Sequence, residues 1–83
     1  MNPDLLCRRL IGRHLARRKY DFDEQSRSRG IYGFSLEEHA AFSKPYQAKR
    51  SKLKEYMLRR HGLKGSRFER LWQEVAKRPE EWS

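Results

Sequence analysis

The sequence contains one cysteine, Cys7, so no disulfide can form within a chain and nothing in it indicates an oxidising compartment. It has no apolar run near the roughly 20 residues that a membrane-spanning helix needs. It also lacks the apolar block and small-residue cleavage site of a secretory leader. Residues 1–20 are arginine-rich like an organellar transit peptide, but Asp4 and the lack of serine and threonine there argue against one. We therefore expect a cytoplasmic protein that is not associated with a membrane.

Motifs for catalysis and metal binding are absent as well. The sequence has no CxxC, HExxH, phosphate-binding glycine loop or nucleophile elbow. His14, His39 and His61 are far apart, and Cys7 stands at no metal-ligand spacing from any of them. We expect no enzymatic activity, no metal and no cofactor.

The composition is dominated by positive charge. The 83 residues include 20 lysines and arginines against 11 acidic residues, a formal net charge of +9. Solubility alone explains a net charge of about 2 to 8 in a small domain. A chain of this size buries only about 60% of its unfolded surface, so its core must be small. The excess charge favours a polyanionic partner.

The first predicted helix covers residues 3–20. Asn2, Pro3 and Asp4 form a start signal, because they supply a capping side chain, a proline for the first helical position and a carboxylate at the positive helix end. Apolar residues recur at spacings of three and four, and arginines fill the positions between them. Gly12 costs this helix about 1 kcal/mol relative to alanine. Residues 21–34 have no apolar period and are predicted to form a loop.

Two further helices are predicted before the turn at Gly62. Ser35 and Glu38 form a capping box that starts a short helix over residues 36–42. Pro45 then separates this helix from a longer one over residues 45–61, and Gly62 is a C-terminal stop signal.

The last predicted helix, over residues 67–77, begins with a capping box of Ser66 and Glu69. It has the strongest apolar stripe of the chain: Phe68, Leu71, Trp72 and Val75. The tail, residues 79–83, is expected either to fray or to fold back through Trp82. Together these elements predict an all-α protein, a small single-layer bundle of three to four short helices in one domain over residues 1–83.

Residues 54–75 resemble the helix-turn-helix of DNA-binding proteins over about twenty residues. Met57, Leu63, Phe68 and Leu71 stand where such motifs bury side chains around a turn glycine, here Gly62. Leu58 departs from the pattern, because a small residue is usual at that position. If the resemblance holds, residues 67–77 read DNA; the alternative is a plain helical hairpin.

Positive charge is concentrated in two segments. Residues 3–20 have six basic side chains and one acidic one, a net of +5, and residues 44–60 have seven and one, a net of +6. Ordinary solvated helices mix the two signs, so these segments indicate phosphate binding. The predicted nucleic-acid-binding residues are Arg8, Arg9, Arg13, Arg17, Arg18, Lys49, Arg50, Lys52, Arg59, Arg60, Arg67, Arg70, Gln73 and Lys77.

The sequence thus predicts a small basic nucleic-acid-binding protein, and it favours a DNA-binding regulator over an RNA-binding protein. One alternative is an adaptor or inhibitor that docks its arginine-rich surface on an acidic patch of a larger protein, such as a nucleic-acid enzyme. Another is binding to RNA or the ribosome. Aromatic side chains such as Tyr46 and Tyr56 can stack on bases, but in a chain with so few apolar residues they are expected to form the core.

Overall fold

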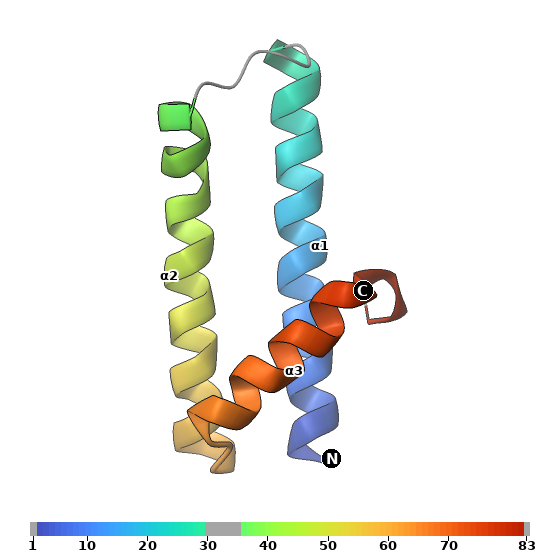
Figure 1. Ribbon diagram of the computed structural model, residues 1–83, viewed down its shortest axis with the longest axis vertical. Helices are drawn as coiled ribbons and strands as arrows, with labels where there is room; N and C mark the ends of the chain where they lie inside the picture. Colours follow the sequence, from blue (N-terminus) through green and yellow to red (C-terminus); the bar gives the residue numbers. More distant parts are fainter. Residues whose placement is uncertain (1, 30–35, 83) are drawn as a thin grey trace.

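The computed structural model describes residues 2–29 and 36–82, and throughout these ranges the regular elements are helices. They are α1 (Pro3–Arg29), α2 (Leu36–His61), α3 (Gly65–Lys77) and a short 3-10 turn, η1 (Pro79–Glu81). α1 and α2 run antiparallel, and α3 crosses one face of this pair (Figure 1). The predicted small all-helical bundle is confirmed. None of the described helices is both long and apolar enough to cross a membrane.

α1 begins at the predicted start signal. The backbone N–H of Asp4 donates to the side-chain oxygen of Asn2 at 2.9 Å, and the N–H of Leu6 donates to the Asn2 carbonyl at 3.0 Å. Pro3 occupies the first helical position, where its missing N–H costs nothing.

The predicted loop over residues 21–34 is wrong for its first nine residues, which continue α1 to Arg29; residues 30–34 lie outside the described residues. Between Gly12 and Gly30 the chain has no glycine or proline to interrupt a helix. Contacts with α2 stabilise the extension, because the ring of Phe22 packs edge-on against His39 and Phe42 at centroid distances of 5.8 and 5.9 Å. Because Phe22 is the one apolar side chain that anchors this segment, its sequence has no apolar period from which a helix could be predicted.

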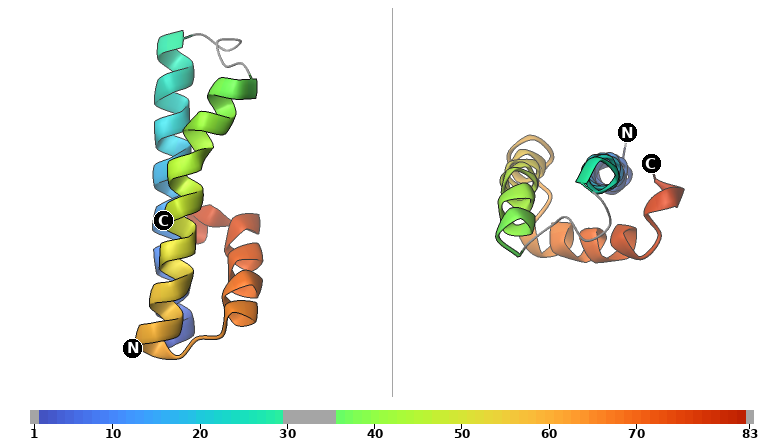
Figure 2. Two further views of the ribbon diagram at one scale, coloured as in Figure 1. Left: turned by 90° about the vertical axis from the view of Figure 1, so that its left-hand side faces the viewer. Right: turned by 90° about the horizontal axis from the view of Figure 1, so that it is seen from above.

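The predicted break between residues 36–42 and 45–61 is also wrong, because α2 is one helix with Pro45 inside it. Proline removes a backbone hydrogen bond and bends a helix, and the first part of α2 leans relative to the rest (Figure 2, left). Contacts to α1 flank the bend: Arg18 donates to Ser43 at 3.4 Å, and Tyr46 donates to the carboxylate of Asp21. Packing on both sides of the proline offsets its cost. Ser35, half of the predicted capping box, lies outside the described residues.

The turn between α2 and α3 forms as the sequence predicts. Gly62 has a φ of +65°, the left-handed conformation that glycine adopts without strain. The N–H of Leu63 donates to the Met57 carbonyl at 3.1 Å, and the N–H of Gly62 donates to the Leu58 carbonyl at 3.0 Å. The bond from Gly62 to Leu58 is that of the αL motif, which ends α2. The bond from Leu63 to Met57 turns the buried Leu63 back onto the core.

The predicted capping box of Ser66 and Glu69 is wrong. α3 begins at Gly65, and the capping position is held by Lys64, whose side chain makes no capping hydrogen bond. Glu69 accepts hydrogen bonds from Arg50 and Lys54 of α2 instead of a backbone amide. Two cations on a neighbouring helix are stronger partners for a carboxylate than one N–H group.

The core lies where α3 covers the α1–α2 pair. It consists of Cys7 and Ile11 of α1, Met57 of α2, Leu63 of the turn, and Phe68, Leu71, Trp72 and Val75 of α3. The apolar stripe predicted for the last helix is thus confirmed as buried. Since α3 supplies half of these side chains, it closes the core.

The C-terminal residues fold back onto α1. Trp82 is half-buried and packs against the core, and the guanidinium carbon of Arg8 lies 5.6 Å from the centre of its ring. A Cβ atom added to Gly12 would lie 2.5 Å from the carbonyl oxygen of Trp82. Glycine is therefore required at this position inside α1 for the close approach.

Candidate nucleic-acid interface

α1 contacts α3 through ion pairs along one side. Arg67 donates to Asp4 at 2.6 Å, and Arg8 pairs with Glu74. Each partner favours the charged form of the other, so the pKa of Asp4 is lowered by its hydrogen bond from Arg67, and the pKa of Arg67 is raised by the same bond. Arg8 and Arg67 were both predicted to bind nucleic acid, but here they join two helices.

A second side of α1 contacts α2, where Arg18 reaches Ser43. The third side carries Arg9, Arg13 and Arg17. These three residues are exposed and repeat every fourth position, so at about 3.6 residues per turn they form one row along the helix. This row faces away from α3.

α2 is divided in the same way. Arg50 points toward α3, since it pairs with Glu69 and its guanidinium carbon lies 4.2 Å from the centre of the Trp72 ring. Lys54 also donates to Glu69, at 3.0 Å. On the side of α2 turned away from α3, a row of exposed residues follows at spacings of three and four: Lys49, Lys52, Tyr56 and Arg60.

The two rows form one surface, which we call the basic face: Arg9, Arg13 and Arg17 of α1 with Lys49, Lys52 and Arg60 of α2. Seen from above, α3 lies on one side of the α1–α2 pair, and no described helix covers the other (Figure 2, right). The side chain of Arg17 reaches Asp21 at 3.3 Å. Within the described residues the other five cations have no ion pair, so they are available to phosphates.

The remaining basic residue predicted on α2 is Arg59, which pairs with Glu55 one turn earlier at 2.6 Å. Both side chains are largely exposed, and such pairs contribute little to stability. The pair mainly cancels one positive charge beside the basic face. On α1, the exposed Glu24 lies one turn beyond Tyr20. This acidic residue therefore stands nearer the C-terminal end of the helix than Arg9, Arg13 and Arg17.

α3 presents a second exposed row, which we call the α3 stripe: Ser66, Arg70, Gln73 and Lys77. Their spacing places them opposite the buried Phe68, Leu71 and Val75. The glutamates that would repel phosphate on this helix turn sideways, Glu69 to α2 and Glu74 to α1. Three of the four residues predicted to read DNA, namely Arg70, Gln73 and Lys77, thus share a stripe free of acidic residues, and Arg67 does not.

The basic face and the α3 stripe lie on opposite sides of the molecule, because α3 covers one side of the α1–α2 pair and its stripe points outward (Figures 1 and 2). The sequence predicts that the two charged segments supply phosphate contacts while residues 67–77 read bases. One straight duplex cannot contact both faces at once. The two sets of predicted residues are therefore separate candidate surfaces.

The thiol of Cys7 and the imidazole of His14 are both packed against the interior of the fold. Cys7 is fully buried, and burial raises the pKa of its thiol to about 11. His14 packs between Tyr46 and Trp72 at centroid distances of 5.9 and 5.4 Å, where burial and the nearby Arg18, Lys49 and Arg50 lower its pKa. Among the described residues, no three His, Cys, Asp or Glu side chains gather as a metal site would require.

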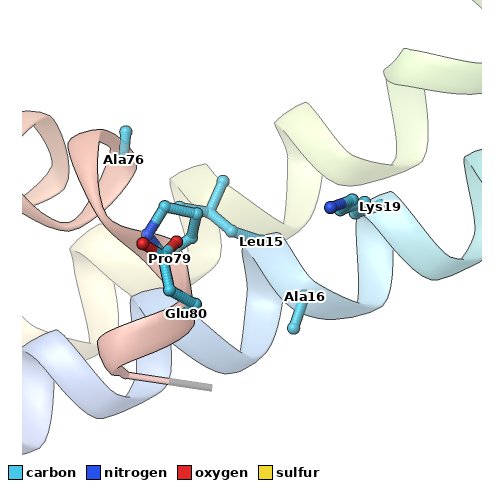
Figure 3. A pocket seen from close by; sticks show the side chains of 6 residues that line it. All are labelled: Leu15, Ala16, Lys19, Ala76, Pro79 and Glu80. Atoms are coloured by element: carbon cyan, nitrogen blue, oxygen red, sulfur yellow. The ribbon is translucent and has the colours of Figure 1, made fainter.

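Two hollows flank the C-terminal segment. The first, of about 290 Å³, is largely apolar and lies between α1, the end of α3 and η1 (Figure 3). Its lining consists of Leu15, Ala16, Lys19, Ala76, Pro79 and Glu80. The second, of about 320 Å³, is mostly polar and opens beside the basic face. Its lining consists of Arg9, Arg13, Glu81 and Trp82.

Two residues of this region were not predicted from the sequence as binding residues: Tyr20 and Trp82. Tyr20 is 58% exposed and continues the row of Arg9, Arg13 and Arg17, a position that its spacing from Arg17 could have indicated. The sequence indicates that Trp82 can fold the tail back, but only the fold brings this side chain beside Arg9 and Arg13. Tyr56, 44% exposed, is a surface residue rather than the core residue expected, whereas Tyr46 is buried as expected.

Comparison with known proteins adds no functional assignment, since no family model, curated protein or solved structure matches this chain.

Proposed function

We propose that this protein binds nucleic acid through the basic face, by contacts to the phosphate backbone. One observation carries the proposal: two antiparallel helices place six cations on a surface that no described helix covers, and five of them lack an ion pair within the described residues. Many acidic side chains elsewhere are engaged in ion pairs, including Asp4, Glu69 and Glu74. The exposed charge of this face is therefore strongly positive.

Such a surface suits a polyanion for two reasons. Arginine and lysine form charge-assisted hydrogen bonds to phosphate oxygens. Each phosphate that is neutralised also releases condensed counterions, which makes binding strongly dependent on salt. Tyr20 and Tyr56 are exposed aromatic side chains beside the cations, and bases stack on such side chains.

The test is a titration of labelled DNA and RNA, each as a single strand and as a duplex, with the affinity measured at several salt concentrations. Binding is expected at low salt, with log K falling by about 0.9 for each phosphate neutralised on duplex DNA per unit of log salt. A double variant, Arg13→Glu with Lys49→Glu, should abolish binding. Arg70→Glu with Lys77→Glu is the control with the same change in charge, because both residues belong to the α3 stripe on the opposite side of the molecule.

Failure of all four ligands to bind at low salt would overturn the proposal. Docking on an acidic protein surface would then be the better explanation of the same cations, and a partner that co-purifies after nuclease treatment would identify it. The preference for DNA over RNA expected from the sequence is decided by the same titration.

The α3 stripe supports a second candidate function, sequence-specific reading of duplex DNA. Arginine and glutamine are the side chains that make bidentate contacts with guanine and adenine edges, and Arg70 and Gln73 are exposed on a helix that follows a three-residue turn. In this case Arg70→Ala would reduce the preference among duplex sequences while the variant of Arg13 and Lys49 would not.

A further inference from the structure

The polar hollow beside the basic face combines groups of three kinds. Arg9 and Arg13 line it from α1, and Trp82 and Glu81 line it from the C-terminal segment. Its volume of about 320 Å³ lies within the range of small-ligand sites, about 300 to 1,000 Å³. Both arginines also belong to the basic face, so a ligand bound to that face passes the mouth of the hollow.

The hollow has positive side chains, Arg9 and Arg13, and one negative side chain, Glu81, and these charges determine which ligand fits it. Neither Arg9 nor Arg13 has an ion pair among the described residues, so both can bind phosphates at the mouth. Glu81 is paired only loosely, at 3.5 Å from Arg78, and its carboxylate would repel a phosphate inside the hollow. A carboxylate accepts hydrogen bonds from donors such as the amino group of cytosine. The interior therefore suits a base, and the mouth suits its phosphates.

Trp82 is held in place before any ligand arrives. Its backbone lies against Gly12, its Cβ fills the space that a side chain there would need, and Arg8 lies near its ring. Arg8 is in turn fixed by Glu74. An aromatic side chain held this way costs little further entropy when a base stacks on it.

We infer that this hollow holds one unpaired nucleobase stacked on Trp82, so that the protein prefers single-stranded over duplex nucleic acid. The inference rests on the proposed function and deepens it. A base inside a duplex is stacked and paired, and it cannot enter without being extruded. A single strand that follows the phosphate-binding cations of the basic face offers unpaired bases directly.

The experiment compares three probes of equal length by fluorescence anisotropy at low salt: an oligodeoxycytidylate, the same strand made of abasic residues, and a duplex. The full chain should bind oligodeoxycytidylate about 10-fold more tightly than the abasic strand, because stacking on one aromatic side chain typically changes affinity by about 5-fold to 100-fold. Equal affinity for these two strands would overturn the inference and leave the proposed function intact. Binding of none of the probes would overturn both.

Variants then assign the effect to Trp82. Trp82→Leu should remove the advantage of the cytidylate strand without weakening the abasic strand, and Trp82→Tyr should retain most of it. Leu58→Ala is the control, since it removes an exposed apolar side chain outside the hollow, and Tyr56→Leu tests the exposed aromatic side chain of the basic face as the competing stacking site. If Tyr56→Leu removes the advantage and Trp82→Leu does not, the base stacks elsewhere and the inference fails.

A measurement on the native chain covers the case in which Trp82→Leu does not fold, as checked by circular dichroism. Stacking quenches indole fluorescence, and Trp72 is 6% exposed and so out of reach of a base. The cytidylate strand should quench the emission of the protein, and the abasic strand should not. Equal quenching by both strands contradicts the inference.

Discussion

Gly12 and Trp82 touch each other across 70 residues of sequence, with no room for a side chain on the glycine. In an isolated helix, Gly12→Ala would stabilise by about 1 kcal/mol. In this fold the added methyl group would displace Trp82, and we expect a net loss of about 1 to 3 kcal/mol in the free energy of unfolding, as for other overpacked sites. Urea denaturation measures the change. A more stable variant would show that the C-terminal segment does not dock there.

The lowered pKa of His14 makes the stability of the fold depend on pH. Burial, Arg18, Lys49 and Arg50 lower its pKa in the folded protein from the ordinary 6.5. The unfolded chain therefore takes up a proton first as the pH falls, and stability declines below about pH 6.5. The melting temperature should fall between pH 7.5 and pH 5.5 on account of this group. His14→Gln should flatten this part of the profile, and an unchanged slope would contradict the assignment.

Two carboxylates, those of Asp4 and Glu69, make stability fall further at lower pH. The pKa values of Asp4 and Glu69 are lowered, the first by its hydrogen bond from Arg67 and the second by that from Lys54. Their contribution to stability is present above their ordinary values of 3.8 and 4.5 and is lost as the pH falls below them. Asp4→Asn combined with Glu69→Gln should reduce the steepness of acid unfolding below about pH 4.5, measured by circular dichroism. Acid unfolding as steep as in the native chain would contradict this role.

Pro45 lies inside a continuous helix and removes one of its hydrogen bonds. Pro45→Ala should raise the free energy of unfolding, by up to about 3 kcal/mol if α2 can straighten. A loss of stability would instead show that the bend is needed to seat Ser43 and Tyr46 on α1. Thermal melts of the two proteins distinguish these results.

Cys7 reports on opening of the core. It is fully buried, and burial raises the pKa of its thiol to about 11, so little reactive thiolate exists at neutral pH. Modification by a thiol reagent should be slow in the native protein and fast in urea. Rapid labelling without denaturant would indicate frequent opening between α1 and α3.

The fold was predictable wherever a residue acts locally. Asn2 and Pro3 start a helix, and Gly62 ends one, through backbone preferences that do not depend on the rest of the chain. The apolar stripe from Phe68 to Val75 likewise follows from periodicity. Predictions failed where partners distant in sequence decide the outcome. Phe22 packs the polar end of α1 against α2. Contacts on both sides of Pro45 keep α2 continuous. Glu69 pairs with Arg50 of α2 and does not cap its own helix.

The candidate site shows the same division. Spacing alone predicts that Arg9, Arg13 and Arg17 share a row. It does not predict that Arg8 and Arg67 turn inward, because their partners Glu74 and Asp4 belong to other helices. The placement of the α3 stripe opposite the basic face also depends on how α3 crosses the pair, which no local pattern determines.

The contacts that close the core also set the order in which it can form. Asp4 contacts Arg67, Arg8 contacts Glu74 and Gly12 contacts Trp82, so the first ten residues of α1 pack in sequence along residues 65–82. While the chain is being synthesised, Cys7 and Ile11 have to wait exposed until that segment emerges. The arginines that flank these apolar side chains oppose association with other nascent chains during this interval.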